Sequence, residues 1–151
     1  MVKNSTVKDW LALSREELDS IYTGCETSGT LPTGEMRGTA ILAGSLFSKT
    51  IAMFARLFAW QGKVFDIFAA DSTAGVLVNK ISLLSLTFVV AKVYRDASWM
   101  DGKPTIVIDY SKTSFFFKKV RDEIREIEPN VYLGKVWWGK TRVLDFALTK
   151  P

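Results

Sequence analysis

The chain has 151 residues, of which 48% are hydrophobic and 24% are charged. This balance indicates one globular domain with a real core and excludes a disordered chain. The formal charge of +4 is scattered along the sequence without a block of lysine or arginine, so composition gives no reason to expect a nucleic-acid partner.

The chain contains no histidine and one cysteine, Cys25. These counts exclude Ser-His-Asp and Cys-His catalysis, histidine-bound metals and an internal disulfide. Acid-base chemistry would fall to Asp, Glu, Tyr or Lys. No phosphate loop or dinucleotide fingerprint is present, so we expect no metal and no cofactor. The opening residues lack the apolar run of a signal peptide, and the expected location is the cytoplasm.

The first predicted element is a short helix from about Arg15 to Tyr22. Ser14 and Glu17 have the spacing of a capping box, in which each side chain accepts a hydrogen bond from the other residue's backbone amide. A loop-like stretch follows, and then a predicted strand at Gly34–Leu42.

The residues from Ser45 to Trp60 change to helical periodicity, and Phe54 and Phe58 belong to this pattern. The predicted helix is apolar nearly all round, which is typical of a covered core helix. The alternative is a lid over an apolar cavity or a surface that touches a membrane; a membrane contact is the less favoured expectation. If a ligand cavity exists, Phe54 and Phe58 are candidates to line it.

Most of the remaining chain is rich in β-branched and aromatic residues separated by turn signals. Strands are predicted at Lys63–Ala69, Gly75–Ser82, Leu86–Arg95, Pro104–Tyr110, Val131–Trp138 and Arg142–Leu148. Eight strands in total, including the two at Gly34–Leu42 and Asp122–Glu128, favour a closed, lipocalin-like antiparallel barrel with one or two helices in a single domain. An α+β cone of the nuclear-transport-factor-like type is the alternative.

The stretch Val120–Ile127 is ambiguous, because Val120, Ile124 and Ile127 sit at helical spacing while Glu128-Pro129-Asn130 is typical of a hairpin turn. We favour a helical turn at Phe115–Val120 followed by a strand from about Asp122 to Glu128.

Three short motifs resemble a bacterial lipocalin-like family named for a G-x-W-x-G motif. Gly34-Glu35-Met36-Arg37-Gly38 is similar to that motif, with Met36 in place of the tryptophan. Trp60-Gln61-Gly62-Lys63-Val64-Phe65 and Val131-Tyr132-Leu133-Gly134, the latter after Ile124-Arg125-Glu126-Ile127, resemble later elements of the family. The activity of that family is poorly defined, so the resemblance implies a barrel fold more than a function.

Asp109 is the first candidate for catalysis. It ends an apolar strand next to Tyr110, and an inward-pointing carboxyl there would have a raised pKa and could act as a general acid. The simpler interpretation is a strand-end aspartate that caps the following turn.

The cluster Arg121–Glu126 supplies the other catalytic candidates: Asp122 as a base, with Arg121 and Arg125 as pairing or orienting groups. In a strand, Arg121, Glu123 and Arg125 share one face and Asp122, Ile124 and Glu126 the other, so one face must turn charge inward. Buried charges need partners, which predicts Arg–carboxylate pairs. A solvated surface segment is the alternative.

Further candidates for ligand contact lie on predicted strands among apolar neighbours, where alternation alone could turn each one outward. They are Asp66, Asn79, Tyr94, Tyr110, Tyr132 and Asp145.

The favoured functional hypothesis is a cofactor-independent acid-base enzyme, an isomerase, lyase or cyclase, that acts on a small apolar molecule such as a terpenoid epoxide or polyketide. The alternative is a carrier of a hydrophobic ligand without chemistry. A third hypothesis is a partner-binding module that uses the phenylalanine-rich predicted helix together with Trp137 and Trp138. A monomer or a homodimer is expected.

Overall fold

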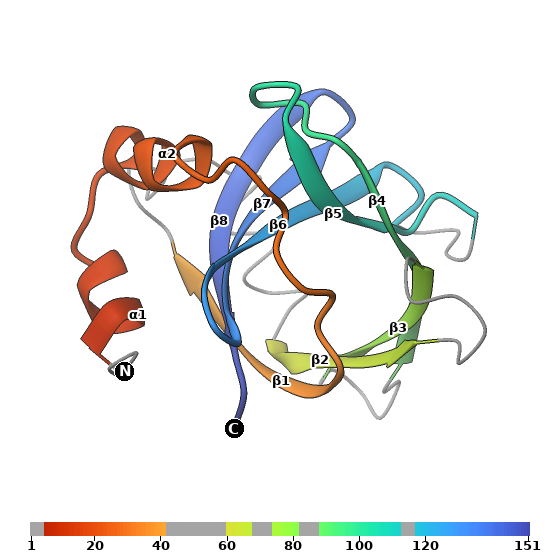
Figure 1. The fold of residues 1–151 in the computed structure, drawn as a ribbon. Helices are drawn as coiled ribbons and strands as arrows, with labels where there is room; N and C mark the ends of the chain where they lie inside the picture. Colours follow the sequence, from red (N-terminus) through yellow and green to blue (C-terminus); the bar gives the residue numbers. More distant parts are fainter. Residues whose placement is uncertain (1–4, 42–59, 68–73, 82–87, 113–116) are drawn as a thin grey trace.

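The computed structural model describes residues 5–41, 60–67, 74–81, 88–112 and 117–151. Two helices precede a set of antiparallel strands, which confirms a mainly β fold (Figure 1). The elements are α1 (Ser5–Trp10), α2 (Arg15–Thr23), β1 (Gly34–Ile41), β2 (Trp60–Ile67), β3 (Ala74–Ile81), β4 (Phe88–Ala97), β5 (Pro104–Asp109), β6 (Val120–Glu128), β7 (Val131–Trp138) and β8 (Thr141–Thr149).

Helix α2 begins where the sequence predicts it. The Ser14 hydroxyl accepts a hydrogen bond from the Glu17 backbone amide at 3.1 Å, and the Glu17 carboxylate accepts one from the Ser14 amide at 2.7 Å. The predicted capping box is thus confirmed. Helix α1 was not predicted, because six residues are too few to show a helical period.

The strands pair in sequence order, each antiparallel to the next, and β8 also pairs with β1, so that the sheet closes on itself. The predicted turns at Asp101-Gly102 and Gly139-Lys140 lie between paired strands. Gly102 and Gly139 have positive φ angles of 74° and 58°, a backbone conformation that glycine adopts without a Cβ penalty.

The stretch Val120–Ile127, which was ambiguous from the sequence, belongs to strand β6. It starts two residues before the expected Asp122, and residues 117–119 form a turn in which the Val120 amide donates to the Phe117 carbonyl at 2.8 Å. The predicted helix from Ser45 onward lies outside the described residues, and Trp60 belongs to β2.

Two apolar clusters lie on opposite faces of the sheet. The inner cluster joins side chains from β1, β4, β5, β6, β7 and β8, among them Met36, Ile106, Ile124, Phe146 and Leu148. The outer cluster joins other residues of β1, β7 and β8 to the helices; its fully buried helix members are Leu18 and Tyr22 of α2. We call the two sides of the sheet the inner and the outer face.

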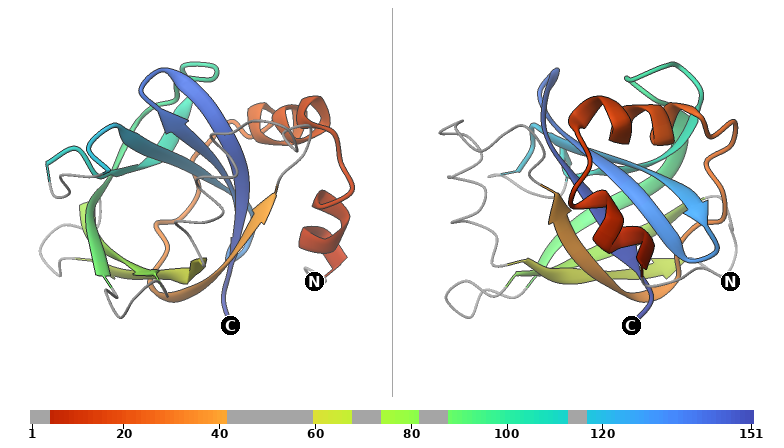
Figure 2. Two further views of the ribbon diagram at one scale, coloured as in Figure 1. Left: turned by 180° about the vertical axis from the view of Figure 1, so that it is seen from behind. Right: turned by 90° about the vertical axis from the view of Figure 1, so that its left-hand side faces the viewer.

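One end of the sheet is covered by residues 24–33, which we call the plug segment (Figure 1). Leu31 of this segment is buried in the inner cluster. The Tyr132 hydroxyl donates to the Thr30 carbonyl at 2.6 Å, and the Thr30 amide donates to the Glu126 carboxylate at 2.7 Å. The β6–β7 turn lies at this end and the β7–β8 turn at the opposite end (Figure 2). No helix among the described residues has the length and apolar character needed to cross a bilayer.

Candidate functional site

The alternation along β6 places its charges on two different faces. Asp122 lies opposite Ile108 and Val136, which belong to the inner cluster, so the Asp122 side chain is on the inner face. Arg125 lies opposite Leu133 of the outer cluster. Arg121, Glu123 and Arg125 therefore point away from the interior, toward α2 and the β4–β5 hairpin.

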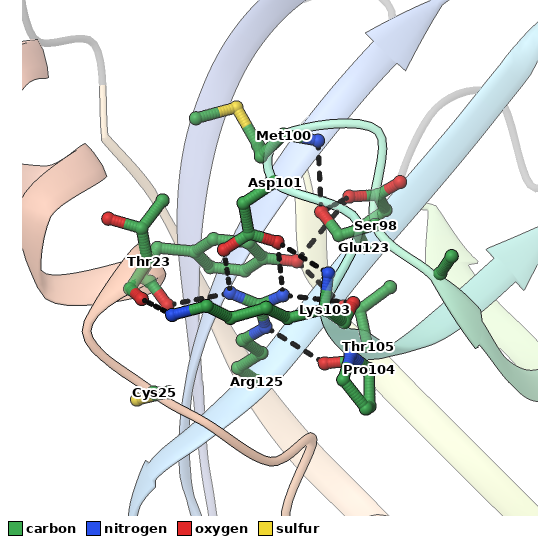
Figure 3. Close-up of polar contacts among 12 residues, drawn as sticks. Thr23, Cys25, Ser98, Met100, Asp101, Lys103, Pro104, Thr105, Glu123 and Arg125 are labelled. Carbon is green, nitrogen blue, oxygen red and sulfur yellow. Dashed lines mark hydrogen bonds and ion pairs between the residues drawn. The ribbon is translucent and has the colours of Figure 1, made fainter.

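Arg125 is fully buried, and every one of its donor groups has a partner (Figure 3). Its two terminal nitrogens donate to the two carboxylate oxygens of Asp101 at 2.8 and 2.7 Å. Further hydrogen bonds reach the backbone carbonyls of Tyr22, Lys103 and Pro104. A buried guanidinium with this bidentate partner and these carbonyls is fully compensated, which is the condition for a stable buried ion pair.

Glu123 has no exposed surface and is equally well satisfied. It accepts hydrogen bonds from the Ser98 hydroxyl at 2.6 Å, the Trp99 amide at 2.8 Å and Arg121 Nε at 3.1 Å. The Tyr22 hydroxyl lies 3.4 Å from it, and burial raises the pKa of this phenol, which keeps its proton. No vacant acceptor position on Glu123 is left for a substrate.

Lys135 and Asp145 continue the same layer toward β8. The fully buried Lys135 ammonium donates to Asp145 at 3.1 Å and to Asp19 of α2 at 2.9 Å, and Arg142 also pairs with Asp19. Burial raises the pKa of Asp145, and its second carboxylate oxygen is buried without a hydrogen-bond partner among the described atoms. We call this set the charged layer: Asp19, Asp101, Arg121, Glu123, Arg125, Lys135, Arg142 and Asp145.

The charged layer corrects the expectation that Arg121 and Arg125 serve a site in the interior, and it places the ligand-contact candidate Asp145 outside the interior as well. They lie on the outer face, between the sheet and the segments that cover it. The buried cations Arg125 and Lys135 are stable on the outer face because the β4–β5 hairpin and α2 supply the carboxylates that they need, Asp101 and Asp19. The role of Arg121, Arg125 and Asp145 as catalytic or binding residues stays a prediction that this geometry does not favour.

Asp109 also lies on the outer face, opposite Arg121. Its carboxylate accepts hydrogen bonds from the Tyr94 hydroxyl at 2.9 Å and the Ser111 amide at 2.8 Å. Burial acts to raise its pKa, but these hydrogen bonds outweigh burial and leave the pKa of Asp109 below its usual value. The expected inward, protonated acid is thus wrong, and the turn-capping interpretation fits. Burial, followed by the bond to Asp109, raises the pKa of Tyr94 to about 12.

Asp122 and Tyr110 form the polar pair of the inner face. Asp122 is 4% exposed and Tyr110 is 2% exposed, and the Tyr110 hydroxyl donates to the Asp122 carboxylate at 3.3 Å. Their nearest strand neighbours on this face are apolar: Val120, Ile124 and Ile108. A phenol and a carboxylate in such surroundings can anchor the polar group of a ligand or transfer a proton to it.

The inner face becomes more exposed toward the end opposite the plug segment. Near the plug, Ile124, Ile106 and Leu148 have no exposed surface. Toward the other end the inner-face residues Trp138 and Leu144 are half-buried, as is Phe117, and all three pack against the inner cluster. Ala40, which pairs with Phe146, is exposed. The Asp122–Tyr110 pair lies on the strand segments that lead toward this more exposed end.

The remaining ligand-contact candidates are Tyr132, Asp66, Asn79, Phe54 and Phe58. Tyr132 is on the inner face at the plug end, where its hydroxyl holds Thr30 and burial raises its pKa. Asp66 and Asn79 lie on β2 and β3, where the structure describes the backbone alone. Phe54 and Phe58 lie outside the described residues.

Sequence reasoning missed Tyr22, Asp101 and Lys135 as partners in the charged layer. Lys135 had a usable signal, because an apolar strand that contains one lysine needs a facing acid, and Asp145 lies directly opposite it. Tyr22 and Asp101 had none, since they reach β6 only through tertiary packing. Among the described residues there is no group of three acidic or cysteine side chains that could hold a metal ion.

No protein-family model matches the sequence, and a search of the curated proteins found no match. A crystal structure of a protein from Thermomonospora curvata is similar in fold, with a TM-score of 0.55 and 15% sequence identity. The similarity covers 92% of this chain and 88% of that one. At this identity the likeness shows a shared fold alone.

Proposed function

We propose that the protein is a lipocalin-like barrel that binds a small, mostly apolar molecule, with the Asp122–Tyr110 pair as its polar anchor. The observation that carries this proposal is the gradient of exposure along the inner face. Apolar side chains are sealed at the plug end and remain partly exposed at the other, next to a buried carboxylate and phenol. Apolar walls with a few convergent polar groups are typical of small-molecule sites.

The charged layer supports the same proposal by elimination. Its cations and carboxylates are directed at α2 and the β4–β5 hairpin, and their hydrogen bonds hold these segments on the sheet. Asp122 is the one residue among the four catalytic candidates whose side chain lies on the inner face. A ligand inside the barrel would therefore meet Asp122 and Tyr110, whereas Arg121 and Arg125 would stay structural.

Ligand binding can be tested with the neutral fluorescent probe N-phenyl-1-naphthylamine. Leu144→Trp would add bulk to the inner face at its exposed end and is expected to weaken probe binding at least tenfold. Leu11→Trp is the matched control, because Leu11 is 52% exposed on the outside and its replacement should leave binding unchanged. Failure of the wild-type protein to bind the probe, or equal affinities in both variants, would contradict the proposal.

Native mass spectrometry of the purified protein tests the polar anchor. A co-purified small molecule is expected on the wild-type protein, and Asp122→Asn and Tyr110→Phe should lower its occupancy. Retention of the molecule at full occupancy in both variants would place its polar group elsewhere.

A second candidate function is acid-base catalysis by the same pair. The specific observation in its favour is the hydroxyl donor 3.3 Å from a buried carboxylate, which suits Tyr110 for protonating a carbonyl or epoxide oxygen and Asp122 for removing a carbon-bound proton. Deuterium uptake into a panel of enolisable ketones in D₂O is the readout. Asp122→Asn should abolish the uptake, and Asp109→Asn, an outer-face control, should not; uptake that is equal in the two variants would rule out Asp122 as the base.

A further inference from the structure

The more exposed end of the inner face carries three aromatic side chains. Val120 of β6 lies opposite Trp138 of β7, and the register of β5 with β6, continued past Asp109, brings Tyr110 beside Val120 on its other side. The Val120 amide donates to the Phe117 carbonyl at 2.8 Å, so a third ring comes from the turn next to the same residue. We call Tyr110, Phe117 and Trp138 the aromatic rim.

The aromatic rim is next to the Asp122 carboxylate. Asp122 lies opposite Val136, two residues before Trp138, so Trp138 is its diagonal neighbour with about 7–8 Å between the Cα atoms. The Tyr110 hydroxyl donates to the Asp122 carboxylate at 3.3 Å. Trp138 and Phe117 are half-buried, whereas Tyr110 and Asp122 are almost fully buried. A molecule that stacks on Trp138 can therefore reach the carboxylate or the phenol through a polar substituent.

The inner face is closed between the polar pair and the plug segment, as far as its described side chains show. Ile106, Ile108 and Ile124 of β5 and β6 have no exposed surface, and neither has Leu148 of β8. Leu31 of the plug segment belongs to the same inner cluster. A long flexible chain would need a channel along these side chains, whereas a compact molecule needs only the end where the aromatic rim is exposed.

We propose that the ligand of the inner face is a compact planar ring system, aromatic or conjugated, that carries a hydroxyl or carbonyl substituent. This inference rests on the ligand-binding proposal and adds the chemical class of the ligand. The ring contacts Trp138 and Phe117, and the substituent hydrogen-bonds to the Asp122–Tyr110 pair. Aromatic rings attract one another beyond the effect of buried apolar area, and a rigid ring loses less conformational entropy on binding than a flexible chain of similar size.

Two neutral alcohols with the same number of carbon atoms test this inference. The first, 2-naphthol, is a planar ring system, the second, 1-decanol, is a flexible chain, and each has a single hydroxyl. Because 1-decanol is the more apolar of the two, burial of apolar surface alone would favour it. Isothermal titration calorimetry of the wild-type protein should instead show roughly tenfold tighter binding of 2-naphthol, the effect expected from one or two aromatic contacts.

Variants separate the ring contact from the hydroxyl contact. Trp138→Leu removes the indole and should abolish most of the preference for 2-naphthol, whereas Trp138→Phe keeps a ring and should retain most of it. Phe117→Leu makes the same test in a turn, without changing a strand. Trp99→Leu is the matched control, because Trp99 is 38% exposed and lies against Arg121 on the outer face. Tyr110→Phe should weaken the binding of both alcohols by a similar factor, and thermal unfolding checks that each variant folds.

Equal affinities for the two alcohols, or tighter binding of 1-decanol, would overturn this inference and leave the ligand proposal standing. An unchanged preference in both Trp138→Leu and Phe117→Leu, or an equal loss in these variants and in Trp99→Leu, would overturn it too, because the effect would not come from the aromatic rim. Binding of neither alcohol would also overturn it. Binding of N-phenyl-1-naphthylamine by the same samples shows separately whether the ligand proposal fails.

Discussion

The two faces of β6 carry similar residue types and use them differently. On the outer face, Arg125 and Glu123 are saturated with partners from α2 and the β4–β5 hairpin. On the inner face, Asp122 shares a hydrogen bond with Tyr110 among apolar side chains. The partners of the outer set come from the segments that cover the sheet, which indicates a structural role, whereas the carboxylate and the phenol of the inner face lie on the side where a ligand is proposed to bind. A buried charge alone therefore does not indicate a functional site; the face of the sheet on which it lies also matters.

The largest expected effect comes from breaking the outer set. Arg125→Ala should lower the free energy of unfolding by about 3–5 kcal/mol, because it leaves Asp101 and three carbonyls without their donor. Denaturant unfolding is the measurement. Arg37→Ala, at an exposed position of β1, should change stability by less than about 0.5 kcal/mol. Similar small losses in both variants would refute a structural role of Arg125.

The same ion pair predicts a pH dependence. Hydrogen bonds from Arg125 are the main cause that lowers the pKa of Asp101 below its ordinary value of 3.8. Its contribution to stability is therefore present above that value and is lost as the pH falls through the lower folded-state pKa. Asp101→Asn should cost about 1.5–3 kcal/mol at neutral pH, and the difference from wild type should shrink in acid. A difference that is independent of pH would contradict the assignment.

The inner face can be probed by overfilling it at its buried end. A Cβ atom at Gly134 would overlap the ring of Phe146, so Gly134→Ala should destabilise the protein by about 1–3 kcal/mol. Phe146→Leu in the same background should recover part of that loss by removing the ring. A single variant as stable as wild type would contradict the close packing of Phe146 against Gly134.

The smallest effect lies outside both faces. Ser14→Ala removes the hydroxyl of the capping box and should cost about 1 kcal/mol, measured by thermal unfolding. Ser14→Asp retains an acceptor oxygen and should preserve most of the stability. An equal loss in both variants would show that the cap contributes little.

The sequence was a good guide to the elements and a poor guide to which way their side chains point. Hairpin turn residues and β-branched runs located the strands near their observed bounds, and the Ser14–Glu17 pattern located α2. For β6, alternation correctly separated Arg121 and Arg125 from Asp122. It could not say which set faces inward, because both contain charges and the deciding partners, Tyr22 and Asp101, come from distant segments.

The sequence by itself determined the mainly β class, the absence of histidine chemistry and the period-two pattern of each strand, because these follow from composition and local geometry. The tertiary structure alone decided that the Arg125 charge is buried against Asp101 and that Asp122 meets Tyr110. Strand pairing and packing are the physical reason, since they decide which face of each strand is the inner one and which distant segments cover the outer one.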